Sequence, residues 1–339
     1  MLRLLRLGLA TFLAASALPA QQPAPPPGPR TGSPFPAFRL PDQAGKLRDL
    51  KSIEGPHGVL LVFFQSADWC PYCKNQLAEM EANLDAARQA GIGLAAVSYD
   101  SPAVLREFAA RRSITFPLLS DHASTLIRAA SLEMAGPPKG SPFFGAAYPA
   151  VVFINESGIV RAKYIHGDLR ERDSAAAVLM QRFGIGGGVA ATVSGKRIEA
   201  RLTSSGSEVS PGERILLEVS FDLRPGLHVY APGVHDYIPI DWSLRPPVGW
   251  TAAPVVFPPS ETLRLEGIQE TVPAYRGHVV LRRDVTVSPD ASPGPVILSG
   301  ALRYQACDDT MCYIPETLPL EWKFTVLPLD KTRAAGQNK

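Results

Sequence analysis

The stretch GVLLVFFQSADWCPYCKNQLAEMEANL, residues 58–84, decides how the first half of the chain folds. Its first seven residues form an apolar run that suits a buried β-strand, and Cys70 and Cys73 follow shortly afterwards. From Leu77 onward, apolar residues recur at helical spacing. The sequence therefore predicts a strand, a Cys-x-x-Cys turn and a helix in direct succession.

The position of these cysteines between a strand and a helix indicates redox chemistry. A helix N-terminus offers unpaired N–H groups and the positive end of the helix dipole, and both stabilise a thiolate, the nucleophile of disulfide exchange. We expect Cys70, in the first turn, to attack and Cys73, one turn later, to resolve the mixed disulfide. Pro71 is tolerated between them because first-turn N–H groups have no intrahelical partner.

Two structural alternatives remain open for this motif. One is a stabilising disulfide, which would contribute roughly 2 kcal/mol for so small a loop. The other is a zinc site built from all four cysteines of the chain, which would require both cysteine pairs to lie against each other.

Strand and helix patterns alternate from residue 35 to residue 183, and GIGGG at 184–188 then breaks the pattern. These glycines predict a flexible joint, and they lack the GxGxxG pattern of a nucleotide site. Beyond the joint the helical period disappears, and short strands separated by Pro and Gly clusters predict an antiparallel sandwich. The expected helices are 75–91, 101–112, 124–134 and 174–184, and the expected strands of the second domain are 197–205, 214–223, 279–287, 294–306 and 318–327.

The net charge of the chain and its first 34 residues indicate which classes of protein to expect. The net charge of the 339 residues is +2 without a long run of one sign, which argues against a nucleic-acid-binding face. Residues 1–20 have the layout of a secretory signal peptide, with a short membrane anchor as the alternative. Residues 21–34 are a Pro-rich spacer. We therefore expect an exported, periplasmic protein in a compartment where disulfides can form.

Residues 33–183 resemble the thioredoxin superfamily, and most closely its peroxiredoxin-like redoxins of the AhpC/TSA group. The resemblance rests on FFQSADWCPYC (63–73), FPLLSD (116–121) and YPAVVFI (148–154). It implies that Cys70 is the nucleophile and Cys73 the resolving thiol. The residues expected to shape or support the substrate groove are Trp69, Pro71, Tyr72 and Pro149, the last matching a cis-proline of the family, with an ordinary trans bond as the alternative.

The sequence departs from the redoxin pattern at two functional positions. Cys70 replaces the Thr of the peroxidatic Thr-x-x-Cys motif, so that Cys73 stands at the peroxidatic position, and Ser66 replaces the expected Pro. These changes favour disulfide exchange over peroxidase activity. Phe64 replaces the buried acid of many thioredoxins, so that Asp68 either handles protons or is a solvated charge.

A second pair, Cys307 and Cys312, lies in YQACDDTMCYIPET, residues 304–317. On a hairpin with a four-residue loop the two cysteines would face each other with Cα atoms roughly 4.5–5.5 Å apart, a separation that allows a disulfide. A purely structural staple remains the alternative.

Residues 190–328 resemble the N-terminal domain of the thiol:disulfide interchange protein DsbD, an immunoglobulin-like sandwich that passes electrons through one cysteine pair. The resemblance is carried by LRYQACDDTMCYIPETLPL (302–320) and GLHVYAPG (226–233). It implies that Cys312 attacks and Cys307 resolves, and that a loop caps the pair, for which 264–270 is the candidate. The supporting aromatic residues would be Tyr230, Tyr304 and Tyr313.

The sequence thus predicts a thiol–disulfide oxidoreductase with an α/β thioredoxin-like domain followed by an all-β immunoglobulin-like sandwich. The predicted divisions are 1–20, 21–34, 35–183, a linker at 184–189, 190–329 and a polar tail at 330–339. We expect no cofactor or metal and no transmembrane segment in the mature chain. The expected partners are other thiol–disulfide proteins. The six histidines are expected to be solvated or structurally satisfied.

Three functions follow from this reading. The first is disulfide exchange, with an internal relay in which the glycine joint brings Cys70 to Cys312. The second is a thiol peroxidase that uses Cys73. The third is a partner-docking module whose second disulfide is inert.

Overall fold

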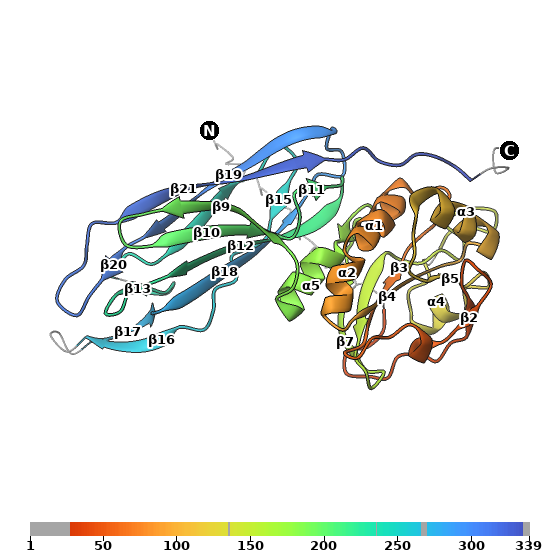
Figure 1. Cartoon of the computed structure of the whole chain (residues 1–339), viewed down its shortest axis with the longest axis horizontal. Helices are drawn as coiled ribbons and strands as arrows, with labels where there is room; N and C mark the ends of the chain where they lie inside the picture. Colours follow the sequence, from red (N-terminus) through yellow and green to blue (C-terminus); the bar gives the residue numbers. More distant parts are fainter. Residues whose placement is uncertain (1–27, 135, 235, 266–269, 335–339) are drawn as a thin grey trace, which may run out of the picture.

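The computed structural model describes residues 28–134, 136–234, 236–265 and 270–334. Two lobes follow each other along the longest axis of the molecule (Figure 1). The first is an α/β redoxin lobe and the second is an all-β sandwich, so the predicted fold class is confirmed. The predicted signal peptide, 1–20, and the first part of the spacer lie outside the described residues.

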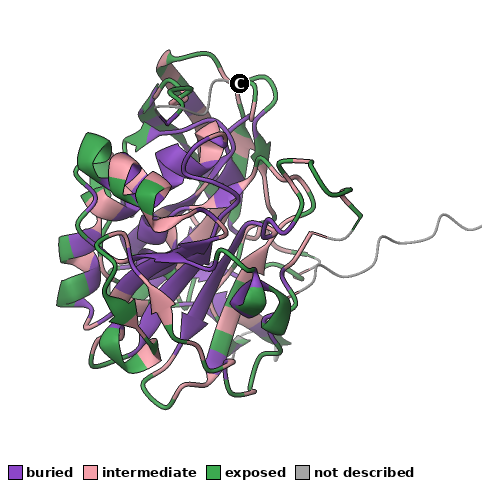
Figure 2. Ribbon diagram, turned by 90° about the vertical axis from the view of Figure 1, so that its right-hand side faces the viewer, coloured by how far each residue is buried: buried purple, intermediate pink, exposed green. Residues whose placement is uncertain are grey.

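A five-stranded sheet with strand order β5-β4-β3-β6-β7 forms the centre of the redoxin lobe. Buried strands lie between helices on the two faces of this sheet (Figure 2). Alternate residues of the apolar run at 58–64 point to opposite sides, with Leu60 and Val62 in one core and Val59 and Leu61 in the other. The strands are β3 (Val59–Phe63), β4 (Gly93–Ser98), β5 (Leu118–Ser120), β6 (Ala150–Ile154) and β7 (Val160–Ile165), and a small hairpin pairs β1 (Leu40–Pro41) with β2 (Leu47–Arg48) ahead of the 3-10 turn η1 (Leu50–Ser52).

Two of the expected helices in this lobe differ from the sequence patterns. The expected helix at 75–91 is divided at Asn83, which ends one helix and begins the next. The pattern at 124–134 is helical only as far as Ala129, because Ser131 adopts a left-handed conformation with φ 57°. The helices are α1 (Pro71–Ala82), α2 (Leu84–Gln89), α3 (Pro102–Arg112), α4 (Thr125–Ala129) and α5 (Ala175–Phe183).

Three sheets build the sandwich. Its main core contains Trp242 and Trp322, whose rings stack with centroids 5.7 Å apart. One sheet is β9 (Gly188–Ser194), β10 (Glu199–Ser204), β12 (Glu213–Asp222), β18 (His278–Thr286) and β15 (Thr251–Ala252). The second is β11 (Glu208–Val209), β21 (Glu316–Val326), β19 (Gly294–Tyr304) and β14 (Asp241–Arg245), and the third is β16 (Glu261–Leu265), β17 (Glu270–Tyr275), β13 (His228–Tyr230) and β20 (Ala306–Cys307).

The expectation of a loose glycine joint is wrong in this structure, because the two lobes share backbone pairing. β8 (Arg172–Asp173) comes before the joint but pairs in parallel with β12 of the sandwich. Gly212, with φ 78°, lies so close to the carbonyl oxygen of Arg170 that a side chain would collide with it. Arg214 of β12 also forms an ion pair with Asp173 at 3.5 Å. The lobes are therefore docked rather than tethered.

The chain beyond β21, as far as residue 334, packs on the redoxin lobe, where the sequence predicts a polar tail from residue 330 onward. It runs from the sandwich along the redoxin lobe past α1 and α3 (Figure 1). The side chain of Asn75 on α1 donates to the carbonyl oxygen of Pro328 at 3.1 Å, and Asp330 forms ion pairs with Arg111 and Arg112 on α3. Residues 328–334 thus form a strap across the start of α1, and we call them the C-terminal strap.

Within the part of the chain that the structure describes, no helix has the length and apolar character needed to cross a membrane.

Candidate functional site

The first cysteine pair occupies the junction that the sequence predicts. Cys70 is the N-cap of α1, Pro71 is its first residue, and Cys70 Sγ accepts a hydrogen bond from the Cys73 N–H at 3.2 Å. The two cysteines form a disulfide with Cα atoms 5.3 Å apart. Their residues are only 2% and 0% exposed, so this disulfide is enclosed in the docked structure.

Arg172 lies against both sulfur atoms, and the sequence analysis missed it. Its Nη2 is 3.4 Å from Cys70 Sγ, 3.3 Å from Cys73 Sγ and 3.3 Å from Gln65 Oε1. Nη1 donates to the carbonyl oxygens of Leu169 and Glu171. Burial lowers the pKa of Arg172 to about 9. A guanidinium held here favours a thiolate once the disulfide is reduced.

Two predicted aromatic residues connect the motif to its surroundings. Trp69 Nε1 donates to the hydroxyl of Tyr99 at 2.8 Å, and its ring meets Phe143 edge to face at 4.8 Å. Tyr72 faces the sandwich instead, because its hydroxyl donates to the carbonyl oxygen of Pro289 at 3.1 Å. Trp69 therefore supports the redoxin lobe, and Tyr72 belongs to the contact between the lobes.

Pro149 does not have the cis bond that the family resemblance suggests. It directly precedes β6, whose Ala150 pairs with Phe63 at the end of β3. No peptide bond among the described residues is cis. The alternative of an ordinary trans X–Pro bond at a strand start therefore holds here.

Asp68 is not a solvated charge. It is 3% exposed, and the C-terminal strap holds it: Oδ1 accepts from the Ala334 N–H at 2.7 Å, and Oδ2 lies 2.9 Å from Arg333 Nη2. Lys74, fully buried nearby, donates to the carbonyl oxygens of Asp68 and Thr332. A role for Asp68 in proton handling remains a prediction.

Two carboxylates, the half-buried Glu79 and the buried Glu213, meet where the lobes dock. Glu79 of α1 accepts hydrogen bonds from the N–H groups of Ala175 and Ala176, and Glu213 of β12 accepts one from Ser210. Burial raises the pKa of Glu79 to about 7. Burial and the nearby Glu79 raise the pKa of Glu213. Both carboxyls line a small cavity beside Arg172.

The second cysteine pair is built differently. Cys307 and Cys312 form a disulfide with Cα atoms 4.0 Å apart, and they face each other across an isolated antiparallel bridge. Cys307 is 1% exposed, whereas Cys312 is an exposed residue. Of the two sulfur atoms, that of Cys312 is therefore the more accessible, and the roles of Cys312 as attacking thiol and Cys307 as resolving thiol stay a prediction.

The loop between these cysteines is organised by Asp308. This carboxylate accepts from the Thr310 hydroxyl at 2.7 Å and from the Tyr313 hydroxyl at 2.7 Å, and these hydrogen bonds hold its pKa well below the ordinary value. Arg197 lies over the Tyr313 ring, 4.0 Å from its centroid. Tyr313 thus fixes the base of the loop.

The other two predicted tyrosines have different surroundings. The Tyr230 hydroxyl lies 3.7 Å from Cys312 Sγ, so it meets the second pair as expected. Tyr304 belongs to the main core of the sandwich, where burial raises its pKa to about 12. Of the candidate cap at 264–270, residues 266–269 lie outside the described residues.

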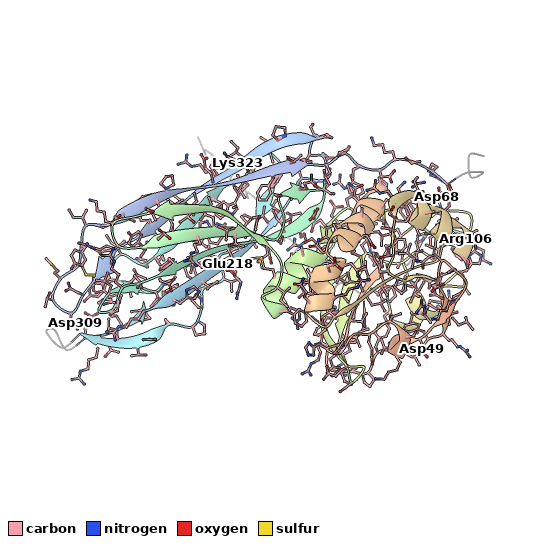
Figure 3. All side chains as sticks on the ribbon, viewed as in Figure 1. Asp49, Asp68, Arg106, Glu218, Asp309 and Lys323 are labelled. Carbon is pink, nitrogen blue, oxygen red and sulfur yellow. A yellow bond between two sulfur atoms is a disulfide. The ribbon has the colours of Figure 1, made fainter. Side chains whose placement is uncertain are left out.

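The two cysteine pairs lie far apart. The second pair, whose loop contains Asp309, is at the tip of the sandwich, whereas Asp68, two residues before Cys70, lies in the redoxin lobe (Figure 3). The first pair itself is enclosed against Arg172, where the lobes dock. A zinc site shared by all four cysteines is therefore excluded in this arrangement. For the same reason Cys70 and Cys312 cannot meet while the lobes are docked.

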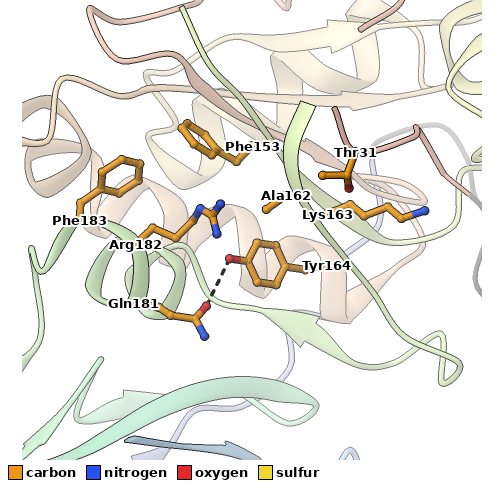
Figure 4. Close-up of a pocket in the computed structure, with 8 residues that line it drawn as sticks. All are labelled: Thr31, Phe153, Ala162, Lys163, Tyr164, Gln181, Arg182 and Phe183. Atoms are coloured by element: carbon orange, nitrogen blue, oxygen red, sulfur yellow. Dashed lines mark hydrogen bonds between the residues drawn. The ribbon is translucent and has the colours of Figure 1, made fainter. Parts of the chain in front are cut away.

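A shallow hollow on the redoxin lobe lies apart from both cysteine pairs (Figure 4). Tyr164 donates to Gln181 at 3.2 Å there, and the Arg182 guanidinium lies 5.3 Å from the centroid of the Phe153 ring. Its lining contains no cysteine and no carboxylate, so we assign it no part in the redox chemistry.

Comparison with known proteins agrees with this division of the chain. Residues 31–163 match the AhpC/TSA family. Residues 200–321 match the family described as thiol:disulfide interchange protein DsbD, N-terminal. Both resemblances expected from the sequence are thus confirmed, each for its own part of the chain.

Peroxiredoxins are among the curated relatives of this chain. Peroxiredoxin Bcp of Escherichia coli strain K12 is 34% identical over 92 residues, which are 27% of this chain and 58% of that protein. The chloroplastic peroxiredoxin Q of Populus jackii is 31% identical over 91 residues, which are 27% of this chain and 42% of that protein. The chain spans about half the length of these relatives.

Solved structures with a partial likeness to this chain include a peroxidoxin and a thiol peroxidase by name. Peroxidoxin BcpB from Mycobacterium tuberculosis has a TM-score of 0.37 and 22% identity, covering 40% of this chain and 86% of that one. The thiol peroxidase from Chromobacterium violaceum has a TM-score of 0.37 and 19% identity, covering 44% and 83%.

Proposed function

We propose that this protein is an exported thiol–disulfide oxidoreductase that exchanges disulfides at Cys70–Cys73 and at Cys307–Cys312. One observation carries the proposal: each lobe holds one cysteine pair joined as a disulfide, in a setting that suits a thiolate or an attack on sulfur. Electrons move as dithiol–disulfide exchange, so no cofactor is required. The partners are other thiol–disulfide proteins.

At the first pair, the Cys70 thiolate attacks a partner's disulfide, forming a mixed disulfide and releasing the partner's second sulfur as a thiolate. Cys73 then gives up its proton and attacks Cys70 Sγ, which releases the partner as a dithiol and leaves Cys70–Cys73 oxidised. The Cys73 N–H and the Arg172 guanidinium stabilise negative charge on Cys70. Because both cysteines are enclosed, a partner reaches them only after the lobes or the C-terminal strap move.

An internal relay requires the same opening. Transfer between Cys70 and Cys312 within one chain would first break the β8–β12 pairing, after which the distant tip of the sandwich would have to turn toward α1. Docking therefore favours transfer through a separate partner or a second copy of the chain.

The test of exchange uses the full chain with Cys307 and Cys312 both replaced by Ser. Reductase activity on a disulfide-bonded protein substrate should then depend on Cys70, and Cys70→Ser should abolish it. Cys73→Ser should instead trap mixed disulfides on Cys70, visible by mass spectrometry. Full activity of the Cys70→Ser variant would remove the assignment.

Thiol peroxidase activity is the second candidate. The matched relatives are named peroxiredoxins, and Arg172 Nη2 lies 3.3 Å from Cys73 Sγ, the position of the family's peroxidatic cysteine. Against it stands the replacement of the motif's Thr by Cys70. Stopped-flow oxidation of the reduced chain by hydrogen peroxide decides between them: a rate like that of a free thiol favours exchange, and fast saturable oxidation at Cys73 favours the peroxidase.

Export rests on the layout of residues 1–20. The mass of the chain recovered from the periplasm of an expressing bacterium should correspond to cleavage near Ala17 or Ala20. An uncleaved chain in the cytoplasm would contradict export and leave the redox chemistry untouched.

A further inference from the structure

His228 lies directly beside the second cysteine pair. β13 pairs antiparallel with β20, and this register sets His228 opposite Cys307. Directly opposed residues project to the same face with Cβ atoms roughly 4.5–5.5 Å apart. Tyr230, two residues further on the same face, packs against the His228 ring at 5.3 Å and meets Cys312. One face of this small sheet therefore gathers an imidazole, a phenol and both sulfur atoms.

The imidazole has no hydrogen-bond partner among the described residues. His228 is 1% exposed, and neither Nδ1 nor Nε2 is paired. The expectation of a solvated or structurally satisfied histidine is therefore wrong here. Burying an unpaired polar group costs about 1–3 kcal/mol, so such a group requires an explanation. The other described histidines do have polar partners: His57, His122, His166 and His278.

Burial is the main influence that favours the neutral form of the His228 ring. Burial and the positive charge of Arg276 lower the pKa of the imidazole, and Asp309 and Asp308 oppose this effect only in part. On the other side of β13 lies β17, whose Tyr275 pairs with Val229, the residue after His228. A neutral imidazole has one nitrogen free to accept a proton, and a thiol is the group that the register places next to it.

We propose that His228 is the base that takes the proton of the Cys307 thiol when the reduced second pair resolves a mixed disulfide. The inference rests on the proposed exchange function of Cys307 and Cys312. It explains why the ring is unpaired in the oxidised structure: the sulfur that it serves is then bonded to Cys312 and carries no proton.

The step balances as follows. The Cys312 thiolate attacks a partner's disulfide, forming a Cys312–partner mixed disulfide and releasing one partner thiolate. The Cys307 S–H passes its proton to the free nitrogen of His228, and the resulting thiolate attacks Cys312 Sγ. The Cys307–Cys312 bond forms, the bond to the partner breaks, and the imidazolium returns its proton to the departing partner thiolate. Two electrons pass from the pair to the partner.

The test uses the full chain carrying Cys70→Ser and Cys73→Ser, so that only the second pair reacts. The reduced protein is mixed with oxidised glutathione, and acid-quenched samples are alkylated and weighed by mass spectrometry to follow the glutathione adduct on Cys312 and its closure. With His228→Gln we expect closure at pH 6.5 to be about 100-fold slower, at the lower end of what general bases contribute. The difference should vanish near pH 9, where solvent alone ionises the thiol. His278→Gln, on the same lobe, is the matched control and should close normally.

The outcomes separate the two proposals. If the control forms the adduct but never closes, exchange at the second pair is wrong. If the control closes and His228→Gln follows the same pH profile, the role of His228 is wrong.

Should His228→Gln fail to fold, the imidazole signals of isotope-labelled protein decide the matter. Reduction should shift the His228 resonances and its titration, and Cys307→Ala should abolish that response. Identical signals in the oxidised and reduced protein would overturn the inference.

Discussion

The two cysteine pairs reach related chemistry by opposite designs. The first is enclosed at a helix N-terminus against a buried guanidinium, whereas the second sits on a hairpin at the far end of the sandwich with one sulfur exposed. The first design tunes the thiol and restricts access, and the second gives access and places an unpaired imidazole behind it. The sandwich tip therefore leaves one sulfur open to solvent, whereas the first pair is closed off at the contact between the lobes.

Arg172 is expected to have the largest effect on this contrast. Arg172→Met removes the cation next to both sulfur atoms, so the pKa of the Cys70 thiol in the reduced protein should rise. Each unit of that rise lowers the thiolate fraction near pH 7 about tenfold. Alkylation of Cys70 by iodoacetamide across pH, followed by peptide mass, measures it.

Arg172→Lys, which keeps the charge, should recover part of the rate. Arg170→Met is the matched control from the same segment, since the Arg170 side chain is 44% exposed. An unchanged pH profile in Arg172→Met would mean that the guanidinium is only structural.

Docking itself should depend on pH through Glu79 and Glu213. The pKa of Glu79 is raised to about 7 when the lobes are docked and is 4.5 for an ordinary glutamate. Between pH 4.5 and pH 7 the docked form therefore binds one more proton than the separated form. The resulting stabilisation of the docked form is complete below pH 4.5 and is lost as the pH rises through about 7. Within that window the ratio of docked to separated molecules should fall up to about tenfold per pH unit.

Small-angle X-ray scattering of the full chain measures this as a larger radius of gyration at higher pH. Glu79→Gln combined with Glu213→Gln should flatten the dependence. A pH response that survives both replacements would assign it to other groups.

Removing one contact of the C-terminal strap should have a smaller effect, which we expect in the free energy of unfolding. Arg333→Ala removes the partner of the buried Asp68 carboxylate, and we expect the free energy of unfolding to fall by about 1–2 kcal/mol because Arg333 is partly exposed. Denaturant unfolding of the full chain measures it, with Lys331→Ala as the control. Equal stability of the two variants would show that the contact between Arg333 and Asp68 does not stabilise the fold.

The Tyr230 hydroxyl should have the smallest effect. Tyr230→Phe keeps the ring against His228 but removes the oxygen 3.7 Å from Cys312 Sγ. We expect the first attack of Cys312 on oxidised glutathione to change only about two- to fivefold, as for one weak hydrogen bond. Tyr237→Phe, on the neighbouring ring, is the control. A loss greater than a hundredfold would give Tyr230 a role in proton transfer that the structure does not assign to it.

Local patterns predicted the elements that build each site, and they failed where distant segments meet. The strand, the Cys-x-x-Cys turn and α1 follow from hydrophobic spacing and helix capping within one stretch. Arg172 lies 99 residues beyond Cys73, on a two-residue strand that exists only because β12 receives it. No periodic signal marks so short a strand.

The same limit explains the remaining misses. No sequence pattern marks His228 as a site residue, because its position opposite Cys307 depends on the register of β13 and β20. The glycines at 184–188 indicate backbone freedom, yet they cannot report the pairing that holds the lobes together. Pro149 matched a family position by sequence alone, and the isomer of its peptide bond depends on packing that sequence does not encode locally.

The strand that the redoxin lobe contributes to β12 has a practical consequence for dividing this protein. The glycine segment at 184–188 is the obvious place to divide the chain into two fragments. Such a division would separate β8 from β12 and leave the start of β12 with unpaired backbone groups on one edge. Such an edge is a template for unwanted strand pairing. A sandwich fragment beginning at residue 190 should therefore be prone to association that has nothing to do with its cysteines. A fragment that retains residues 168–174 through a fused linker would be the sounder starting material for isolated work.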